Sequence, residues 1–264
     1  MTTVFFLFLF HQALGLLLAL VFVTDHAGDR FFRLSSAAAA LMTTAGLGLL
    51  ARRFGVAAPQ APGGGAYAAV LALTVASLLL MVVYNRAWAF EWRGRRPLLF
   101  SALAAGLASV ALAAPAASRA LVIANDLTSI ALLGGTAGAM ILGHYYLMVL
   151  DLPIRALRSL TLLLAVALAL RTLVVAFALL GPVHAGLSDA GLVAAGLWSP
   201  DGVFVWMRLL FGIVGPASLM WFVWKTVEIR STQSATGILY VQLFLVLSGE
   251  LLAKYLRVAA GLPL

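Results

Sequence analysis

Cysteine is absent from this chain of 264 residues. Without a thiol, the chain forms no disulfide bond, has no thiolate nucleophile and cannot hold zinc or an iron–sulfur cluster through cysteine sulfur. Any redox centre in this polypeptide is therefore held by histidine or is a diffusible cofactor. The sequence also contains no Walker A loop, no H-E-x-x-H zinc motif and no G-x-S-x-G nucleophile elbow.

Charged side chains are scarce, at 10% of the residues, against about 25% in soluble domains. Hydrophobic residues make up 64%, and the mean hydropathy is +1.08. A helix needs ~20 apolar residues to cross ~30 Å of hydrocarbon, and the apolar runs here reach that length. They are continuous rather than alternating, which favours helices over barrel strands. The composition predicts an all-α, polytopic membrane protein.

Breaks at proline, glycine and charged residues divide the chain into eight expected transmembrane helices within one integral membrane domain. The expected spans are roughly 3–24, 34–51, 66–85, 98–116, 128–150, 158–181, 203–225 and 234–257. The second is short, and we expect short interfacial helices within 117–126 and 182–202. The first run lacks a basic leading segment, so we interpret it as a span and not as a signal peptide. Eight spans are compatible with two four-helix bundles.

Basic residues are unevenly distributed between the two sets of connections. Ten follow helices 1, 3, 5 and 7, namely Arg30, Arg33, Arg86, Arg93, Arg95, Arg96, Arg155, Arg158, Lys225 and Arg230, whereas the other side has five. The positive-inside rule therefore predicts that both termini lie outside the cytoplasm. The formal charge of +8 then reflects loops facing anionic membrane lipid and requires no nucleic-acid partner. We expect an integral protein of a bacterial inner membrane.

Ionisable side chains inside a span cost about 2.5–3.5 kcal/mol each on insertion scales, so each needs an explanation. The polar residues within the expected spans are His11, Gln12, His144, Arg171, Arg208, Gln242, Glu250 and Lys254.

Four of these residues are expected to lie near one another in the outer half of the membrane. Glu250 and Lys254 are four residues apart and face the same side of the last helix. Arg208 falls at a similar depth, and the long side chain of Arg171 reaches that level from mid-membrane. One interpretation is structural, because buried charges must pair and would fix the helix packing. The other is a site that handles protons or binds a headgroup.

The segment GGTAGAMILGHYY precedes the end of the fifth span and contains two rows of small residues. Such rows let a second helix, or a flat ring, approach closely. His144 and Tyr145 follow them, so we consider both plain packing and a wall for an aromatic headgroup. Tyr146 is interpreted as part of the interfacial aromatic belt. His11 and His144 are expected about 10 Å apart in depth, which disfavours a bis-histidine haem.

The last span contains LFLVLSGELLAKYL (residues 243–256), where Gly249, Glu250 and Leu251 precede the base Lys254. It resembles the C-terminal span of the membrane-anchor subunits of DMSO-reductase-type complexes, the NrfD-like group. The span count, the external termini and the lack of cysteine are similar to that group. The resemblance implies an anchor without haem that binds a quinol and passes its electrons to an iron–sulfur subunit docked outside. Glu250 is the one position carried over, as a proton-handling or structural residue.

The leading hypothesis is a quinone-interacting subunit of a respiratory or photosynthetic complex, working with an iron–sulfur or cytochrome partner. The cofactor is expected to be menaquinone or ubiquinone, with no haem, no metal site and no catalytic residue of the chain's own. The candidates for quinone binding or proton handling are His144, Tyr145, His11, Gln12, Glu250, Arg171 and Arg208. Two alternatives stay open: a small-solute or ion transporter with Arg171 and Glu250 in its path, and a non-catalytic scaffold subunit.

Overall fold

The computed structural model describes residues 1–54, 64–115, 118–149, 152–184, 202–262 and 264, which are helical with short connections and contain no strand. The helices are α1 (Thr2–Val21), η1 (Asp25–Ala27), α2 (Asp29–Phe54), α3 (Gly64–Ala89), α4 (Arg96–Ala113), α5 (Arg119–Tyr146), α6 (Arg155–His184), α8 (Gly202–Leu209), η3 (Leu210–Val214), α9 (Gly215–Glu228) and α10 (Thr232–Ala259). Eight helical segments of the described chain are long and apolar enough to cross a membrane. The all-α, eight-helix prediction is confirmed.

Two of the expected boundaries are wrong. The second span is not short, because α2 is a helix of 26 residues. Residues 119–126 are not a separate interfacial helix but the first two turns of α5, which has 28 residues. The polar pair Asn125–Asp126 lies in that stretch, and both side chains are buried. The other expected interfacial helix, in 182–202, falls almost wholly on residues outside those described.

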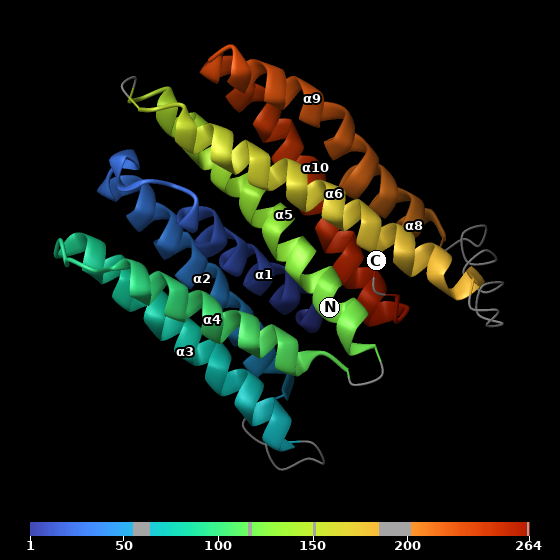
Figure 1. The fold of residues 1–264 in the computed structure, drawn as a ribbon. Helices are drawn as coiled ribbons and strands as arrows, with labels where there is room; N and C mark the ends of the chain where they lie inside the picture. The colour runs from blue at the N-terminus through green and yellow to red at the C-terminus, as the bar shows by residue number, and fades with distance from the viewer. Residues whose placement is uncertain (55–63, 116–117, 150–151, 185–201, 263) are drawn as a thin grey trace.

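Helices α1 and α5 form the centre of the bundle, with α2–α4 on one side and α6–α10 on the other (Figure 1). Buried residues make up 67% of the apolar window in α1 and 61% in α5, against 17% in α3. On the outer helices, Phe177, Trp221 and Phe244 are 65%, 64% and 66% exposed. Large apolar side chains on the outside match a hydrocarbon surrounding and not water. The two groups of four spanning helices meet mainly where α1 packs on α5.

The small residues of α5 explain how closely α1 approaches it. A Cβ on Gly134 would overlap the backbone of Gly15, and one on Gly138 would press on Ala19. The matching order of these contacts means that α1 and α5 run in the same direction. On its other sides, α5 meets α6 at Gly135 and α10 at Gly143. The predicted rows are therefore covered by neighbouring helices and do not form an open wall for a ring.

The seventh span departs from α-helical geometry before Pro216. Residues Leu210–Val214 form a turn of π-helix between α8 and α9. The proline ring clashes with the carbonyl four residues earlier, which is that of Gly212, and wider winding relieves the clash. The side chain of Gln242 in α10 donates a hydrogen bond of 3.1 Å to the Pro216 carbonyl. Gly212 also lies against Gly249 of α10, so the two helices cross closely beside Glu250.

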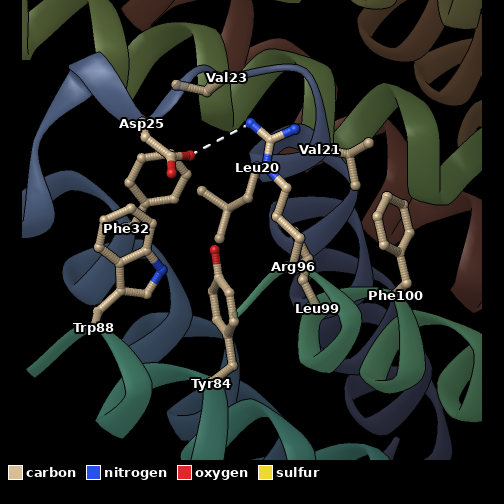
Figure 2. Close-up of a pocket in the computed structure, with 10 residues that line it drawn as sticks. All are labelled: Leu20, Val21, Val23, Asp25, Phe32, Tyr84, Trp88, Arg96, Leu99 and Phe100. Carbon is tan, nitrogen blue, oxygen red and sulfur yellow. Dashed lines mark hydrogen bonds and ion pairs between the residues drawn. The ribbon is translucent and has the colours of Figure 1, made fainter. Parts of the chain in front are cut away.

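The connections rich in arginine, which follow α1, α3, α5 and α9, lie together; we call this the basic end. There the α1–α2 connection is hydrogen-bonded to the α3–α4 connection (Figure 2). Asp25 accepts hydrogen bonds of 3.3 and 3.4 Å from Arg95 and Arg96. Trp88 stacks on Phe32 with 4.2 Å between ring centroids, and the Arg95 guanidinium lies 3.4 Å from the Trp88 centroid. These contacts fix the basic end without using any of the predicted site residues.

Candidate functional site

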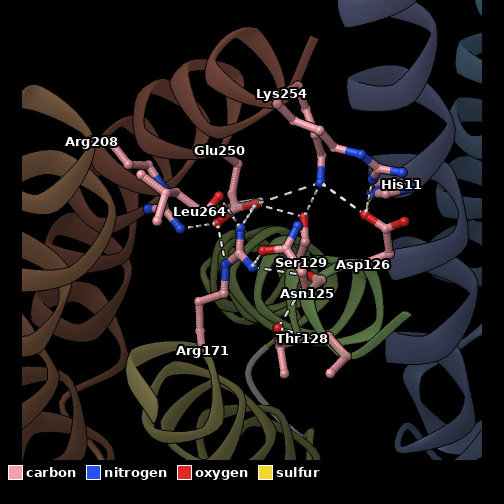
Figure 3. Close-up of polar contacts among 12 residues, drawn as sticks. His11, Asn125, Asp126, Thr128, Ser129, Arg171, Arg208, Glu250, Lys254 and Leu264 are labelled. Atoms are coloured by element: carbon pink, nitrogen blue, oxygen red, sulfur yellow. Dashed lines mark hydrogen bonds and ion pairs between the residues drawn. The ribbon is translucent and has the colours of Figure 1, made fainter. Parts of the chain in front are cut away.

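A cluster of ionisable and polar groups is buried in the half of the bundle away from the basic end (Figure 3). We call it the buried ionic cluster. Its members come from α1, α5, α6, α8, α10 and the segment after α10, and they are His11, Asn125, Asp126, Ser129, Arg171, Arg208, Glu250, Lys254, Arg257 and the main-chain oxygen of Leu264.

Glu250 is one centre of the cluster and has no exposed surface. Arg171 contacts its carboxylate with both Nε at 2.9 Å and Nη2 at 3.1 Å. Arg208 Nη2 donates to the same carboxylate at 3.0 Å, and Ser129 Oγ donates at 2.5 Å. Two-pronged arginine–carboxylate pairs are among the strongest hydrogen-bonded pairs in proteins. Four donors saturate the carboxylate, so Glu250 is better placed to anchor helices than to exchange a proton.

Asp126 is the second centre of the cluster. It lies on α5, one helical turn before Ser129. Arg257 Nη1 lies 2.5 Å from its Oδ1, and Lys254 Nζ lies 3.8 Å from the same atom. Lys254 also donates to Ser129 Oγ at 2.9 Å and lies 3.9 Å from Glu250. Ser129 and Lys254 thus join the two carboxylates into one network. His11 Nδ1 is 4.0 Å from Asp126, and neither of its ring nitrogens has a hydrogen-bond partner among the described residues.

The two central arginines differ in how fully they are paired. Besides Glu250, Arg171 donates to the Asn125 carbonyl at 3.0 Å, to the Asn125 side-chain oxygen and to the Leu264 oxygen at 3.2 Å. Arg208 bonds only through Nη2, and its Nε and Nη1 have no partner among the described residues. Arg171 is therefore a structural clamp, whereas Arg208 keeps buried donors that are free to bind something else.

The sequence predicted that Arg171, Arg208, Glu250 and Lys254 would meet, and the structure brings all four together. Asp126 and its neighbours on α5 were missed, because their stretch was assigned to a surface helix. The i, i+4 spacing of Asn125 and Ser129 was the available signal, since it places two polar groups on one face of a continuing helix.

Two other predicted residues of the spans lie beside the cluster or away from it. Gln12 is buried next to His11 in α1, and its Oε1 has no partner within the described chain. Gln242 bonds to Pro216 and takes no part in the cluster.

A second site lies at the basic end, in a groove between α2, α5 and α10 that we call the His144 groove. It encloses about 490 Å³ and is lined by Arg30, Phe31, Leu34, Met140, Ile141, His144, Tyr145, Met148 and Tyr240. His144 Nδ1 and the Tyr240 hydroxyl are 3.2 Å apart, with their rings edge to face. Tyr145 lies against Phe31, with 6.3 Å between ring centroids. The lining is apolar apart from these hydroxyls, the imidazole and the Arg30 guanidinium.

Two expectations about this region need correction. Tyr146 is not a belt residue, because it is 4% exposed and its hydroxyl donates a hydrogen bond of 2.6 Å to the Pro153 carbonyl. His144 itself is exposed on the outer surface of the bundle. His11 lies level with Asp126, which is 18 residues before His144 on α5. At 1.5 Å per residue the two histidines are about 27 Å apart along the axis, not 10 Å.

Tyr240, the hydrogen-bonding partner of His144, was also missed. It is 96 residues away in sequence, and a lone tyrosine in an apolar helix gives no signal of its own.

The chain matches no protein-family model, no curated protein and no solved structure. The resemblance of residues 243–256 to the NrfD-like anchors therefore stays a prediction. The structure does give that segment a physical explanation. Gly249 permits the close crossing with Gly212, and Glu250 receives the two arginines.

Proposed function

We propose that this chain is a quinone-interacting membrane subunit of an electron-transfer complex, and that the quinone binds in the His144 groove. The observation that carries the proposal is the His144–Tyr240 pair, a hydrogen-bonded imidazole and phenol inside a mostly apolar groove on the membrane-facing surface. A quinone has two carbonyl oxygens that need hydrogen-bond donors, a flat ring and a long apolar tail. These features match a groove of this kind.

The lining residues supply each requirement of a quinone headgroup. The pair occupies Nδ1 of His144, while the other ring nitrogen makes no hydrogen bond within the described residues. His144 and Tyr240 can therefore hold one carbonyl oxygen and its proton. Arg30 and the Tyr145 hydroxyl offer donors for the other oxygen. Phe31 and the tyrosine rings flank a flat ring, and the two methionines adapt to its substituents.

The quinone supplies two-electron, two-proton redox chemistry, and this chain has no cysteine with which to hold an iron–sulfur cluster. We therefore propose an iron–sulfur or cytochrome partner subunit as the electron donor or acceptor. The groove lies near the basic end, so the partner is expected to dock there. If both termini lie outside the cytoplasm of a bacterial inner membrane, as the arginine distribution predicts, this is the cytoplasmic side. The resemblance to NrfD-like anchors had implied docking on the other side.

The test is binding of a short-chain menaquinone or ubiquinone analogue to the purified chain in lipid nanodiscs. His144→Ala and Tyr240→Phe each remove one hydrogen-bonding group. We expect each to weaken binding about tenfold, because the loss of one hydrogen bond costs about 1.4 kcal/mol of binding free energy. His26→Ala is the matched control, because His26 is exposed at the same end but does not line the groove. Binding that is absent, or equally strong in all four proteins, contradicts the proposal.

The scaffold hypothesis is the second candidate, and the saturation of Arg171 and Glu250 favours it. A scaffold needs the buried ionic cluster for assembly but has no use for the His144 groove. Replacement of His144 by alanine would then leave both complex assembly and quinol-dependent turnover unchanged. The same variant tested in the assembled complex therefore separates the two functions.

A further inference from the structure

Among the described residues, the buried ionic cluster contains more positive than negative side chains. Its cations are Arg171, Arg208, Lys254 and Arg257, and its anions are Asp126 and Glu250. Even if the Leu264 oxygen bonded to Arg171 is counted as a full negative charge, four cations face three anions. Three of the cations have no exposed surface. An unbalanced charge in a low-dielectric interior is costly, so a compensating charge is expected.

Arg208 is the cation of the cluster whose hydrogen-bond donors are least satisfied. It is wholly buried, and among the described residues only its Nη2 has a partner, the Glu250 carboxylate at 3.0 Å. Nε and Nη1 are buried without a partner in the described part of the chain. An arginine cannot relieve this by losing its proton. Leaving such donors unpaired costs the full desolvation of each group.

Two glycines lie on one side of Arg208. Gly212 lies beside the guanidinium, and a Cβ there would collide with Nη1. Gly249 of α10 packs against Gly212 from the opposite side. The helix carrying Arg208 also widens into π-helical winding at Leu210–Val214, a feature that is frequent at functional sites. Because the two helices pack this closely beside the guanidinium, any ligand of its unpaired donors has to be small.

We propose that the buried ionic cluster binds a small monovalent inorganic anion, of the size and charge of chloride, at an unpaired N–H group of the Arg208 guanidinium. This anion lowers the excess positive charge and satisfies a donor that no described residue reaches. The site is separate from the His144 groove, because Glu250 is ten residues from Tyr240 on α10, or about 15 Å. Loss of a proton from Lys254 is the competing way to reduce the charge, and it would not depend on which anion is present.

The experiment compares thermal unfolding of the purified full chain in sodium chloride, sodium bromide and sodium gluconate at equal ionic strength. Gluconate is too large for the site. The three salts therefore screen charges equally, but only the halides can bind beside Arg208. We expect the halides to raise the Tm by about 5–11 °C at a hundredfold excess over the dissociation constant. Arg208→Gln should abolish this difference. Arg119→Gln, at an exposed arginine of the same end, should retain it.

A second measurement holds even if Arg208→Gln fails to fold. Crystals of the unchanged chain grown in bromide should give an anomalous peak in contact with the Arg208 guanidinium. Equal Tm values in halide and gluconate overturn the proposal, as does a halide effect that survives in Arg208→Gln. Absence of bromide from the Arg208 position in the crystals also overturns it.

Discussion

Glu250→Gln tests whether the buried ionic cluster holds the helices together. The substitution keeps the shape of the side chain but removes the charge that faces Arg171 and Arg208 at 2.9 and 3.0 Å. Breaking a buried ion pair by removing one partner costs about 3–5 kcal/mol, because the other charge is left uncompensated. Two arginines are affected here, so the upper part of that range is expected. For a chain of this size, the full range of about 3–5 kcal/mol corresponds to a fall in Tm of roughly 6–20 °C.

The assay is thermal unfolding of the purified protein followed by intrinsic tryptophan fluorescence. Thiol-reactive dyes cannot report on this chain because it has no cysteine, but it contains six tryptophans. Glu228→Gln is the matched control. Its carboxylate pairs with Lys225 at 2.8 Å on the surface, where both side chains are almost half exposed. Exposed pairs of this kind contribute little, so the control should unfold close to the unchanged protein.

A double substitution sharpens the test further. In the Glu250→Gln background, Arg208→Gln removes a guanidinium that has already lost its partner. The two changes together should therefore cost less than the sum of the two measured singly, by about 0.5–3 kcal/mol. Additive effects, or a Tm of Glu250→Gln within about 2 °C of the unchanged chain, would refute the view that Glu250 is the hub of the cluster.

Two further substitutions test the packing of α5. Gly134→Ala should destabilise the bundle by several degrees in Tm, because its Cβ overlaps the backbone of α1, whereas Gly237→Ala meets nothing within 4 Å and should be neutral or stabilising. Equal Tm values for the two variants would show that the helix contact is not tight. Tyr146→Phe should lose about 1 kcal/mol with the hydrogen bond to Pro153, measurable by thermal unfolding, while Tyr145→Phe should not lose stability.

Hydropathy alone was sufficient to determine the class of this protein. An apolar run of about 20 residues has one stable structure in a bilayer, a helix that bonds its own backbone. The eight spans follow from that rule. The free-energy cost of a charge in the membrane also explains why Arg171, Arg208 and Glu250 were expected to meet. A buried charge needs a partner of opposite sign, and only residues at a similar depth can provide it.

Hydropathy failed at the start of α5, where a polar pair inside a helix has the same appearance as a polar connection. Asp126 is tolerated there because Arg257, 131 residues further along the chain, lies beside it. The sequence contains no local sign of that pairing. The same holds for Tyr240 and His144, which are brought together only because α10 packs against α5.

The sequence by itself therefore determined the helical class, the number of spans and which polar residues are unfavourable in the membrane unless they are paired. Only the tertiary structure decided what each of those residues does. Saturation turns Glu250 and Arg171 into anchors, unpaired donors make Arg208 a candidate ligand site, and exposure beside Tyr240 places His144 in a groove. The physical reason is that span formation depends on local transfer free energy, whereas the role of a buried polar group depends on which partners reach it across helices.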